Sequence, residues 1–236
     1  MAPGVGDIEG HDSIQSEMMG EMCLVVDIDD NVVSSETKLD CHKNDGIRHR
    51  AFSVLIFDSQ GRLLVQKRSS EKITFPGVWA NSCCSHPLDM ESENEGSNGV
   101  ENAARRKLEQ ELGIPLDITE KWSFNHIGRM EYSCRWNEDW IEREIDHIMV
   151  VNADTDVSHN ENEISDVLWA DSSEINRMME GGGKWGDEVI APWFKLIWEN
   201  YAEPHGCEPI AMANSINEGI IYCGEVNMNG DSINPG

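Results

Sequence analysis

Basic side chains are scarce in this chain. It has 18 Lys and Arg against 44 Asp and Glu, which gives a formal net charge of −26 at pH 7 with histidine neutral. No run of five or more Lys and Arg occurs anywhere. Nucleic acids and anionic membrane surfaces are themselves negatively charged, so a chain this acidic is repelled by both. The composition therefore predicts that neither is a partner.

Long apolar runs and a targeting segment are also lacking. No stretch approaches the roughly 18 consecutive apolar residues that a membrane-spanning helix requires. Signal and transit peptides are basic and poor in acidic residues, whereas this chain begins with several carboxylates. They belong to Asp7, Glu9, Asp12 and Glu17. We therefore expect a cytoplasmic protein without a membrane span.

The cysteines do not form a disulfide framework. There are seven of them, an odd number, and their spacing is irregular. Stable disulfides belong mostly to oxidising compartments, so this pattern favours a reducing one. The length of 236 residues indicates one large domain, since a domain takes about 150 residues on average.

Short apolar runs closed by turn residues predict several strands. These runs are residues 23–26, 32–33, 51–57, 62–67, 145–151 and 167–170. Residues 1–20 are polar and acidic without periodicity, and we interpret them as a flexible acidic arm. Residues 89–99 are acidic and rich in Gly and Ser, which predicts a mobile loop.

Three segments have helical patterns. Apolar residues recur with helical spacing over 100–112, and Gly113 supplies a C-terminal stop. A second helix is predicted from Ser172, as its cap, to the glycines at 181–183, and a third over 189–201. Strands followed by a mixture of strands and helices favour an α+β or α/β sandwich. Residues 203–236 form a C-terminal tail of unknown role.

A set of histidines and carboxylates has the chemistry of a metal site. Its members are His42, His49, His86, Glu142 and Glu144. Residues two apart on a strand project to the same face, so Glu142 and Glu144 can point into one site. Three imidazoles and two carboxylates suit Zn²⁺, Mn²⁺ or Mg²⁺. The alternative is that each is a solvated surface residue, and the spacing alone leaves both readings open.

Cys84 lies two residues before His86. A thiol near a cation or metal can have its pKa lowered from about 8.5 towards neutrality, which makes it a proton acceptor or nucleophile. The alternatives are a small buried apolar residue or a disulfide with Cys83, which the reducing context disfavours. The neighbourhood of Trp79 and His86 favours a functional role.

Residues 106–114 resemble the end of the Nudix box, R-E-U-x-E-E-x-G-U, whose helix carboxylates hold Mg²⁺ against a diphosphate. The agreeing residues are Arg106, Leu108, Glu111, Gly113 and Ile114. Lys107 and Gln110 replace two glutamates of the hydrolase pattern. A site with fewer carboxylates loses metal charge, so we expect diphosphate binding without hydrolysis. A solvated charged helix face is the alternative interpretation.

Five runs resemble type I isopentenyl-diphosphate Δ-isomerase, particularly its eukaryotic form. They are ETKLDCH (36–42), HRAFSVLIF (49–57), ITFPGVWANSCCSHPL (73–88), NAARRKLEQELGI (102–114) and EREIDHI (142–148). The resemblance covers about residues 20–200. It implies a single Nudix-type α/β/α sandwich with a mixed central sheet over residues 21–202, and the interconversion of isopentenyl and dimethylallyl diphosphate through a tertiary carbocation.

The resemblance also implies roles for individual residues. His42, His49, His86, Glu142 and Glu144 would ligate one divalent metal, Mg²⁺ with Zn²⁺ or Mn²⁺ as options, and Glu111 would hold a second Mg²⁺ with the diphosphate. Glu144, assisted by Tyr132, is the expected acid and Cys84 the expected base, the order depending on reaction direction. Lys38, Arg68, Lys72 and Arg106 would clasp the diphosphate, and Trp193 would face the isoprenoid carbons. The expected partner is a small isoprenoid diphosphate, bound by a monomer.

Two other functions are alternatives to this isomerase activity. A Nudix diphosphohydrolase would use the carboxylates that Lys107 and Gln110 replace, so the sequence argues against it. A non-catalytic metal-binding module would not need Cys84, Glu111 and Glu144 together, and all three are present.

Overall fold

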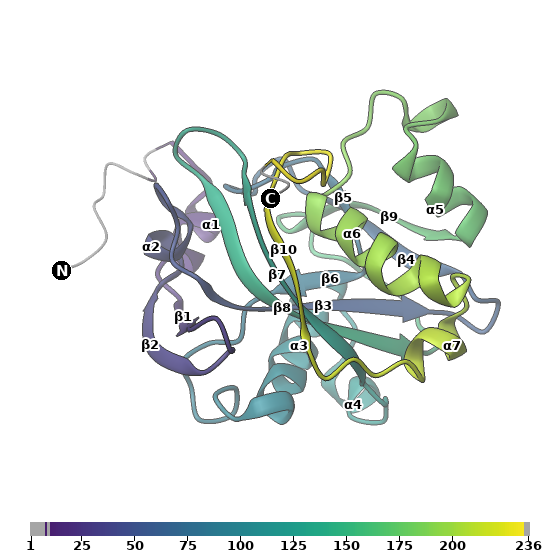
Figure 1. Cartoon of the computed structure of the whole chain (residues 1–236), viewed down its shortest axis with the longest axis horizontal. Helices are drawn as coiled ribbons and strands as arrows, with labels where there is room; N and C mark the ends of the chain where they lie inside the picture. The colour runs from purple at the N-terminus through teal and green to yellow at the C-terminus, as the bar shows by residue number, and fades with distance from the viewer. Residues whose placement is uncertain (1–7, 9, 234–236) are drawn as a thin grey trace.

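A computed structural model describes residue 8 and residues 10–233 of the chain. The described strands join one curled mixed sheet in the order β10-β7-β8-β3-β1-β2, with β4, β5, β6 and β9 branching from it (Figure 1). The strands are β1 Met22–Val26, β2 Val32–Thr37, β3 His49–Phe57, β4 Leu63–Arg68, β5 Trp79–Ala80, β6 Cys83–Ser85, β7 Asn125–Arg135, β8 Ile141–Asn152, β9 Ile164–Ala170 and β10 Ile220–Val226. All the strands predicted from apolar runs are confirmed.

Helices cover both faces of this sheet. The α-helices are α1 Ser13–Met18, α2 Lys38–His42, α3 Gly96–Leu112, α4 Leu116–Thr119, α5 Ser172–Met179, α6 Pro192–Ile197 and α7 Pro209–Ala213. Short 3₁₀ turns occupy Gly183–Trp185 and Glu203–His205, and a π-helical turn occupies Trp198–Ala202. Helices α3 and α6 lie on opposite sides of the central strands (Figure 1), so the predicted α/β/α sandwich is confirmed.

The parallel pair β3 and β8 forms the centre of the sheet. Their register runs from His49 opposite Glu144 to Phe57 opposite Asn152. Every residue of β3 is buried, as expected of a strand covered on both faces. Side chains alternate along β3, so Phe52 packs with the α3 cluster while Leu55 and Phe57 pack with the α6 cluster.

Helix α3 begins earlier than its apolar spacing indicates. It starts at Gly96, so residues 96–99 of the segment predicted as a mobile loop are helical. Its end at Gly113 is confirmed: this residue has φ 66°, and its N–H donates to the carbonyls of Glu109 and Leu108. Lys107 and Glu111 are both buried, so the alternative interpretation of a solvated charged face does not hold at Lys107.

Two other helix predictions need correction. The cap of α5 is Asp171, whose carboxylate accepts from the Glu174 N–H, and Ser172 is the first helical residue. The helix predicted over 189–201 begins only at Pro192, since proline cannot donate within a helix but fits its first turn. Its second half is the π-helical turn. Strand β7 was missed because polar residues alternate along it and leave no continuous apolar run.

The described residues near both chain ends pack against the rest of the domain. Residues 13–18 form α1, capped by Asp12, and Gln15, Met18 and Met19 are buried, so a flexible arm is wrong for this part. Residues 1–7 and 9 of the predicted arm lie outside the described residues. Strand β10 in the C-terminal tail pairs in parallel with β7 at the sheet edge. Among the described helices, none has the length and apolarity needed to cross a membrane.

Replacing Gly113 by alanine should destabilise the fold more than the same change at Gly181. Both have nearly equal φ values, 66° and 65°, so both variants carry the left-handed backbone penalty of about 1–2 kcal/mol. A Cβ at Gly113 would also overlap the Ser158 carbonyl, whereas one at Gly181 would meet nothing within 4 Å. We expect a further loss of about 1–3 kcal/mol in the free energy of unfolding for Gly113→Ala. Equal urea midpoints for the two variants would contradict this.

Candidate active site and metal centre

A cavity at the end of β3 collects most of the predicted site residues. Those that line it are Lys38, Arg68, Lys72, Cys84, His86, Glu111, Tyr132, Glu142, Glu144 and Trp193, together with Ala51, Phe52, Ser53, Thr74, Ser85 and Asp146. They come from α2, β3, β4, β6, α3, β7, β8, α6 and the loops around 72–74 and 86. One cavity therefore joins segments from the first to the last third of the chain.

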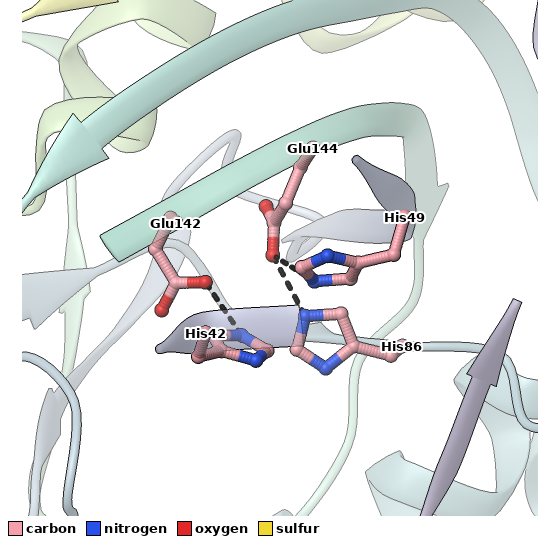
Figure 2. Close-up of side chains that lie close together, drawn as sticks. All are labelled: His42, His49, His86, Glu142 and Glu144. Carbon is pink, nitrogen blue, oxygen red and sulfur yellow. Dashed lines mark hydrogen bonds and ion pairs between the residues drawn. The ribbon is translucent and has the colours of Figure 1, made fainter. Parts of the chain in front are cut away.

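Three histidines and two glutamates meet beside this cavity (Figure 2). They are the predicted His42, His49, His86, Glu142 and Glu144, all buried, and one ligand atom from each lies within 4.8 Å of the others. The three imidazole rings have centroids 4.6–5.0 Å apart. The sequence prediction of one shared cluster is confirmed in space.

Backbone carbonyls orient two of these rings. Nδ1 of His42 lies 2.7 Å from the Lys38 carbonyl, one turn back in α2, and Nδ1 of His49 lies 2.7 Å from the Ile47 carbonyl. A ring that donates from Nδ1 keeps the lone pair of Nε2 free, which is the usual arrangement behind a metal-bound histidine. Both Nε2 atoms can thus serve as ligands when the rings are neutral.

Buried atoms of the cluster are left without hydrogen bonds. Nε2 of His42 and Oε2 of Glu142 lie 2.8 Å apart, yet neither has a hydrogen-bond partner among the described residues. Nε2 of His49 is also unpartnered and lies 3.6 Å from Oε1 of Glu144. Unsatisfied buried polar atoms are costly, so native proteins rarely keep them. A divalent cation would satisfy all of them at once, and the cluster fits divalent metal binding.

Glu144 connects the cluster to the cavity. Its Oε1 lies 2.7 Å from Nε2 of His86, and its Oε2 accepts a hydrogen bond of 2.6 Å from the Tyr132 hydroxyl. Burial opposes ionisation of Glu144, but His49 and Tyr132 hold its pKa below the ordinary value. Burial and the same carboxylate raise the pKa of Tyr132 well above normal. The glutamate is therefore ionised at neutral pH and the tyrosine remains a hydrogen-bond donor.

Cys84 approaches the cavity from the edge of β3 opposite to that of Glu144. Strand β6 pairs Cys84 with Ser53 on one edge of β3, and β8 pairs Glu144 with His49 on the other. The preceding residue, Cys83, points into the α3 cluster, and all seven cysteines, each within the described residues, are free. Burial raises the pKa of Cys84 to about 12, with Arg68 opposing the shift. Without bound ions burial favours the protonated thiol, and the lowering expected beside a metal stays a prediction.

Arg68 is held in the cavity wall by the loop after β4. Arg68 donates to the carbonyls of Thr74 and Phe75 at 2.8 and 3.0 Å, and its guanidinium lies 5.7 Å from the centroid of the Trp193 ring. Trp193 is only 4% exposed and packs edge-on against Phe75. It lines the cavity and belongs to the core at the same time.

Of the four basic residues predicted to bind the diphosphate, Arg106 alone does not line the cavity. Its guanidinium makes two hydrogen bonds of 2.6 and 2.9 Å with the buried carboxylate of Glu93, and it donates to the His86 carbonyl at 3.2 Å. It is not among the described residues that line the cavity. In this structure Arg106 braces the segment that carries His86.

Sequence reasoning missed several polar residues at the site. Asp146 lines the cavity and accepts a hydrogen bond of 2.8 Å from the Ser53 hydroxyl. The alternation that pairs Glu142 with Glu144 continues to Asp146, so this residue could have been found. Lys107, whose Nζ lies 2.9 Å from Oε1 of Glu111, and Glu163 behind Lys72 gave no comparable sequence signal.

Comparisons with known proteins agree with this geometry. The model of the NUDIX domain matches residues 47–194. Among solved structures, a Deinococcus radiodurans protein superposes with a TM-score of 0.56 at 19% identity, covering 77% of this chain and 99% of its own. A NUDIX hydrolase from Alicyclobacillus acidocaldarius superposes with a TM-score of 0.52 at 11% identity, covering 72% and 97%. At these identities the two structures show the fold alone.

Relatives that are similar in sequence identify the family more specifically than the fold does. The isopentenyl-diphosphate Delta-isomerase of Dictyostelium discoideum is 39% identical over 85% of this chain and 87% of its own length. The Bos taurus enzyme of that name is 39% identical over 80% and 86%, and the chloroplastic one of Cannabis sativa 40% identical over 81% and 70%. Because these matches span most of both chains, the protein belongs to the isopentenyl-diphosphate Delta-isomerase family and is built on the NUDIX domain.

Proposed function

We propose that this chain interconverts isopentenyl diphosphate and dimethylallyl diphosphate. The observation that carries the proposal is the pair of proton-transfer groups, Cys84 and Glu144, which approach one cavity from opposite edges of β3. The five-donor cluster beside Glu144 and the basic residues at the same cavity support a substrate that combines a short hydrocarbon with a diphosphate. The same chain supplies both proton-transfer groups and all five donors of the cluster, so we propose that a monomer suffices.

The reaction requires a proton at one carbon and its loss at another. An alkene is a very weak base, so protonation of the terminal methylene carbon gives a tertiary carbocation that must be sheltered from water. Burial favours the protonated thiol of Cys84, and the contacts of Glu144 with His49 and Tyr132 favour its ionised carboxylate. We therefore propose Cys84 as the acid in this direction of the reaction. The S–H bond of Cys84 then breaks as the new C–H bond forms.

The second half of the reaction uses the other group. A C–H bond breaks at the carbon on the diphosphate side of the cation, its electron pair becomes the new double bond, and Glu144 takes the proton. Tyr132 donates a hydrogen bond to the same carboxylate and so holds it in place. The reverse reaction exchanges the two roles. The ring of Trp193 faces the cavity and can stabilise the cation by about 2 kcal/mol when water is excluded.

Metal ions have two places in this proposal. A divalent ion held by His42, His49, His86, Glu142 and Glu144 would supply positive charge that orients the Glu144 carboxylate; the mixed nitrogen and oxygen donors suit Zn²⁺, Mn²⁺ or Mg²⁺. A second Mg²⁺ would bind between Glu111 and the diphosphate. Lys38, Arg68 and Lys72 would bind the diphosphate oxygens directly by charge-assisted hydrogen bonds.

A NUDIX-type hydrolase is the less supported alternative. Helix α3 brings one carboxylate, Glu111, to the cavity, and Lys107 is paired with it. Gln110 accepts from Lys107 at 3.2 Å and contacts the Met18 sulfur, so it adds no charge for a metal. Hydrolysis of a diphosphate depends on metal charge that activates water, and this helix supplies little of it.

Replacing either proton-transfer group should abolish turnover but retain diphosphate binding. We expect Cys84→Ala and Glu144→Gln to lower the rate of conversion of isopentenyl diphosphate by roughly 10²- to 10⁴-fold, the usual contribution of a general acid or base. Inorganic pyrophosphate should bind both variants within a few-fold of the parent, as measured by calorimetry with Mg²⁺. Cys207→Ala, away from the cavity, is the matched control. Near-normal turnover in either variant would refute its role.

Binding of a divalent metal should release a proton below pH 9. Burial opposes protonation of His49, but the Glu144 carboxylate and the Cys23 thiol raise its pKa to about 9. The metal requires the neutral ring, so affinity for Zn²⁺ should rise about tenfold per pH unit up to about pH 9 and then level off. Calorimetry in buffers of different ionisation enthalpy measures the released proton. Zn²⁺ affinity that is constant between pH 6 and 8 would contradict this prediction.

A further inference from the structure

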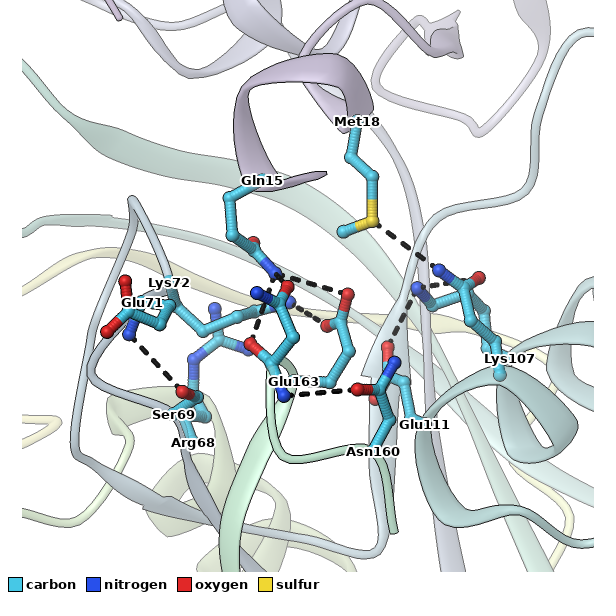
Figure 3. Close-up of polar contacts among 12 residues, drawn as sticks. Gln15, Met18, Arg68, Ser69, Glu71, Lys72, Lys107, Glu111, Asn160 and Glu163 are labelled. Atoms are coloured by element: carbon cyan, nitrogen blue, oxygen red, sulfur yellow. Dashed lines mark hydrogen bonds and ion pairs between the residues drawn. The ribbon is translucent and has the colours of Figure 1, made fainter. Parts of the chain in front are cut away.

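Lys72 forms an ion pair with a carboxylate that has no role in the proposed reaction. Its ammonium lies against Oε2 of Glu163, the residue just before β9 (Figure 3). Lys72 is 8% exposed and Glu163 only 2% exposed. Lys72 lines the cavity, whereas Glu163 is not among the described residues that do. The carboxylate therefore stands behind the lysine, where it contacts the ammonium without facing an anionic substrate.

Glu163 is held rigidly on its other sides. Its carbonyl accepts from the Ser69 N–H at 3.0 Å, and its own N–H donates to the Asn160 carbonyl at 2.9 Å. Oε1 accepts a hydrogen bond of 3.3 Å from Nε2 of Gln15, which α1 places over the pair (Figure 3). Gln15 also donates to Oδ1 of Asn162 at 2.8 Å. Both carboxylate oxygens thus have partners, and α1 covers the pair from solvent.

Charges from several elements act on Lys72. Burial lowers the pKa of Lys72 to about 8, and Arg68 of β4 and Lys38 of α2 act in the same direction. Glu163 is the strongest opposing influence, and Glu111 of α3 also opposes the shift. The pKa of Glu163 lies at about 2 because Lys72 and Lys107 outweigh its burial. Near neutral pH the pair is ionised, and removal of the carboxylate would leave a buried lysine among cations.

We infer that Glu163 is a positioning residue: it fixes the ammonium of Lys72 at the cavity wall as a binding group for the substrate diphosphate. The ammonium has three donors, so one can serve Glu163 while others point to the cavity. The inference rests on the proposed function for the identity of the substrate. It requires only diphosphate binding at Lys72, and this requirement can be measured separately from turnover.

The variant Glu163→Gln removes the charge and keeps the shape. At pH 8 we expect the KM for isopentenyl diphosphate and the Kd for inorganic pyrophosphate with Mg²⁺ to rise about tenfold, while kcat falls less than about threefold. Both effects should shrink as the pH is lowered to 6.5, because protonation of Lys72 restores its charge. Glu161→Gln, two residues away and exposed, is the matched control and should leave KM unchanged.

A purely structural role of Glu163 would give a different result. A kcat that falls with an unchanged KM, or a KM effect that does not depend on pH, would overturn the inference. In a Lys72→Gln background, Glu163→Gln should have no further effect on KM, because Glu163 acts through Lys72. A tenfold rise in that background as well would overturn it equally.

Two further measurements keep the test decisive. If circular dichroism shows that Glu163→Gln does not fold, Glu163→Asp takes its place. This variant moves the carboxylate away from Lys72 by one methylene and should raise KM by a smaller factor. A wild-type KM in that variant would overturn the inference. If the parent chain binds pyrophosphate but forms no dimethylallyl diphosphate, the proposed function fails. The Kd values for pyrophosphate then decide the role of Glu163 alone.

Discussion

The site depends on the parallel pairing of β3 with β8. This pairing sets His49 opposite Glu144, and the same β3 is flanked on its other edge by Cys84 of β6. Because side chains alternate along a strand, a slip of one residue would turn Glu142 and Glu144 to the α3 face and dismantle the metal cluster. The strong burial of β3 on both faces makes such a slip costly. The core of the sandwich therefore secures the geometry of the chemistry.

A second constraint is the burial of charge in a chain of net charge −26. Isolated buried ions are strongly disfavoured, and the described charged side chains around the cavity are mostly paired. Lys107 pairs with Glu111, Lys72 with Glu163, and Arg106 with Glu93. These pairs let cations persist next to the cavity, where an anionic substrate needs them.

The terminal segments complete this arrangement. From helix α1, Gln15 donates a hydrogen bond to Glu163, the partner of Lys72. Met18 of the same helix contacts Gln110, which accepts a hydrogen bond from Lys107. Strand β10 extends the sheet beyond β7, the strand that carries Tyr132, and Val226 is buried there. Helix α1 has no strong apolar pattern of its own, and the short apolar run 220–223 at the start of β10 does not indicate which strand it pairs with. Their structure comes from contacts with the central domain, which local sequence does not contain.

Much of the molecule was predictable from the sequence alone. Turn-bounded apolar runs located the central strands, helical spacing and Gly113 located α3, and the alternation of Glu142 with Glu144 indicated a shared face. These features are local, so neighbouring residues determine them. The tertiary structure alone decided that Arg106 binds Glu93, that Cys84 and Glu144 lie on opposite edges of β3, and that Glu163 contacts Lys72 across 91 residues of chain. Those outcomes depend on burial and on distant partners, which arise only when the sheet closes.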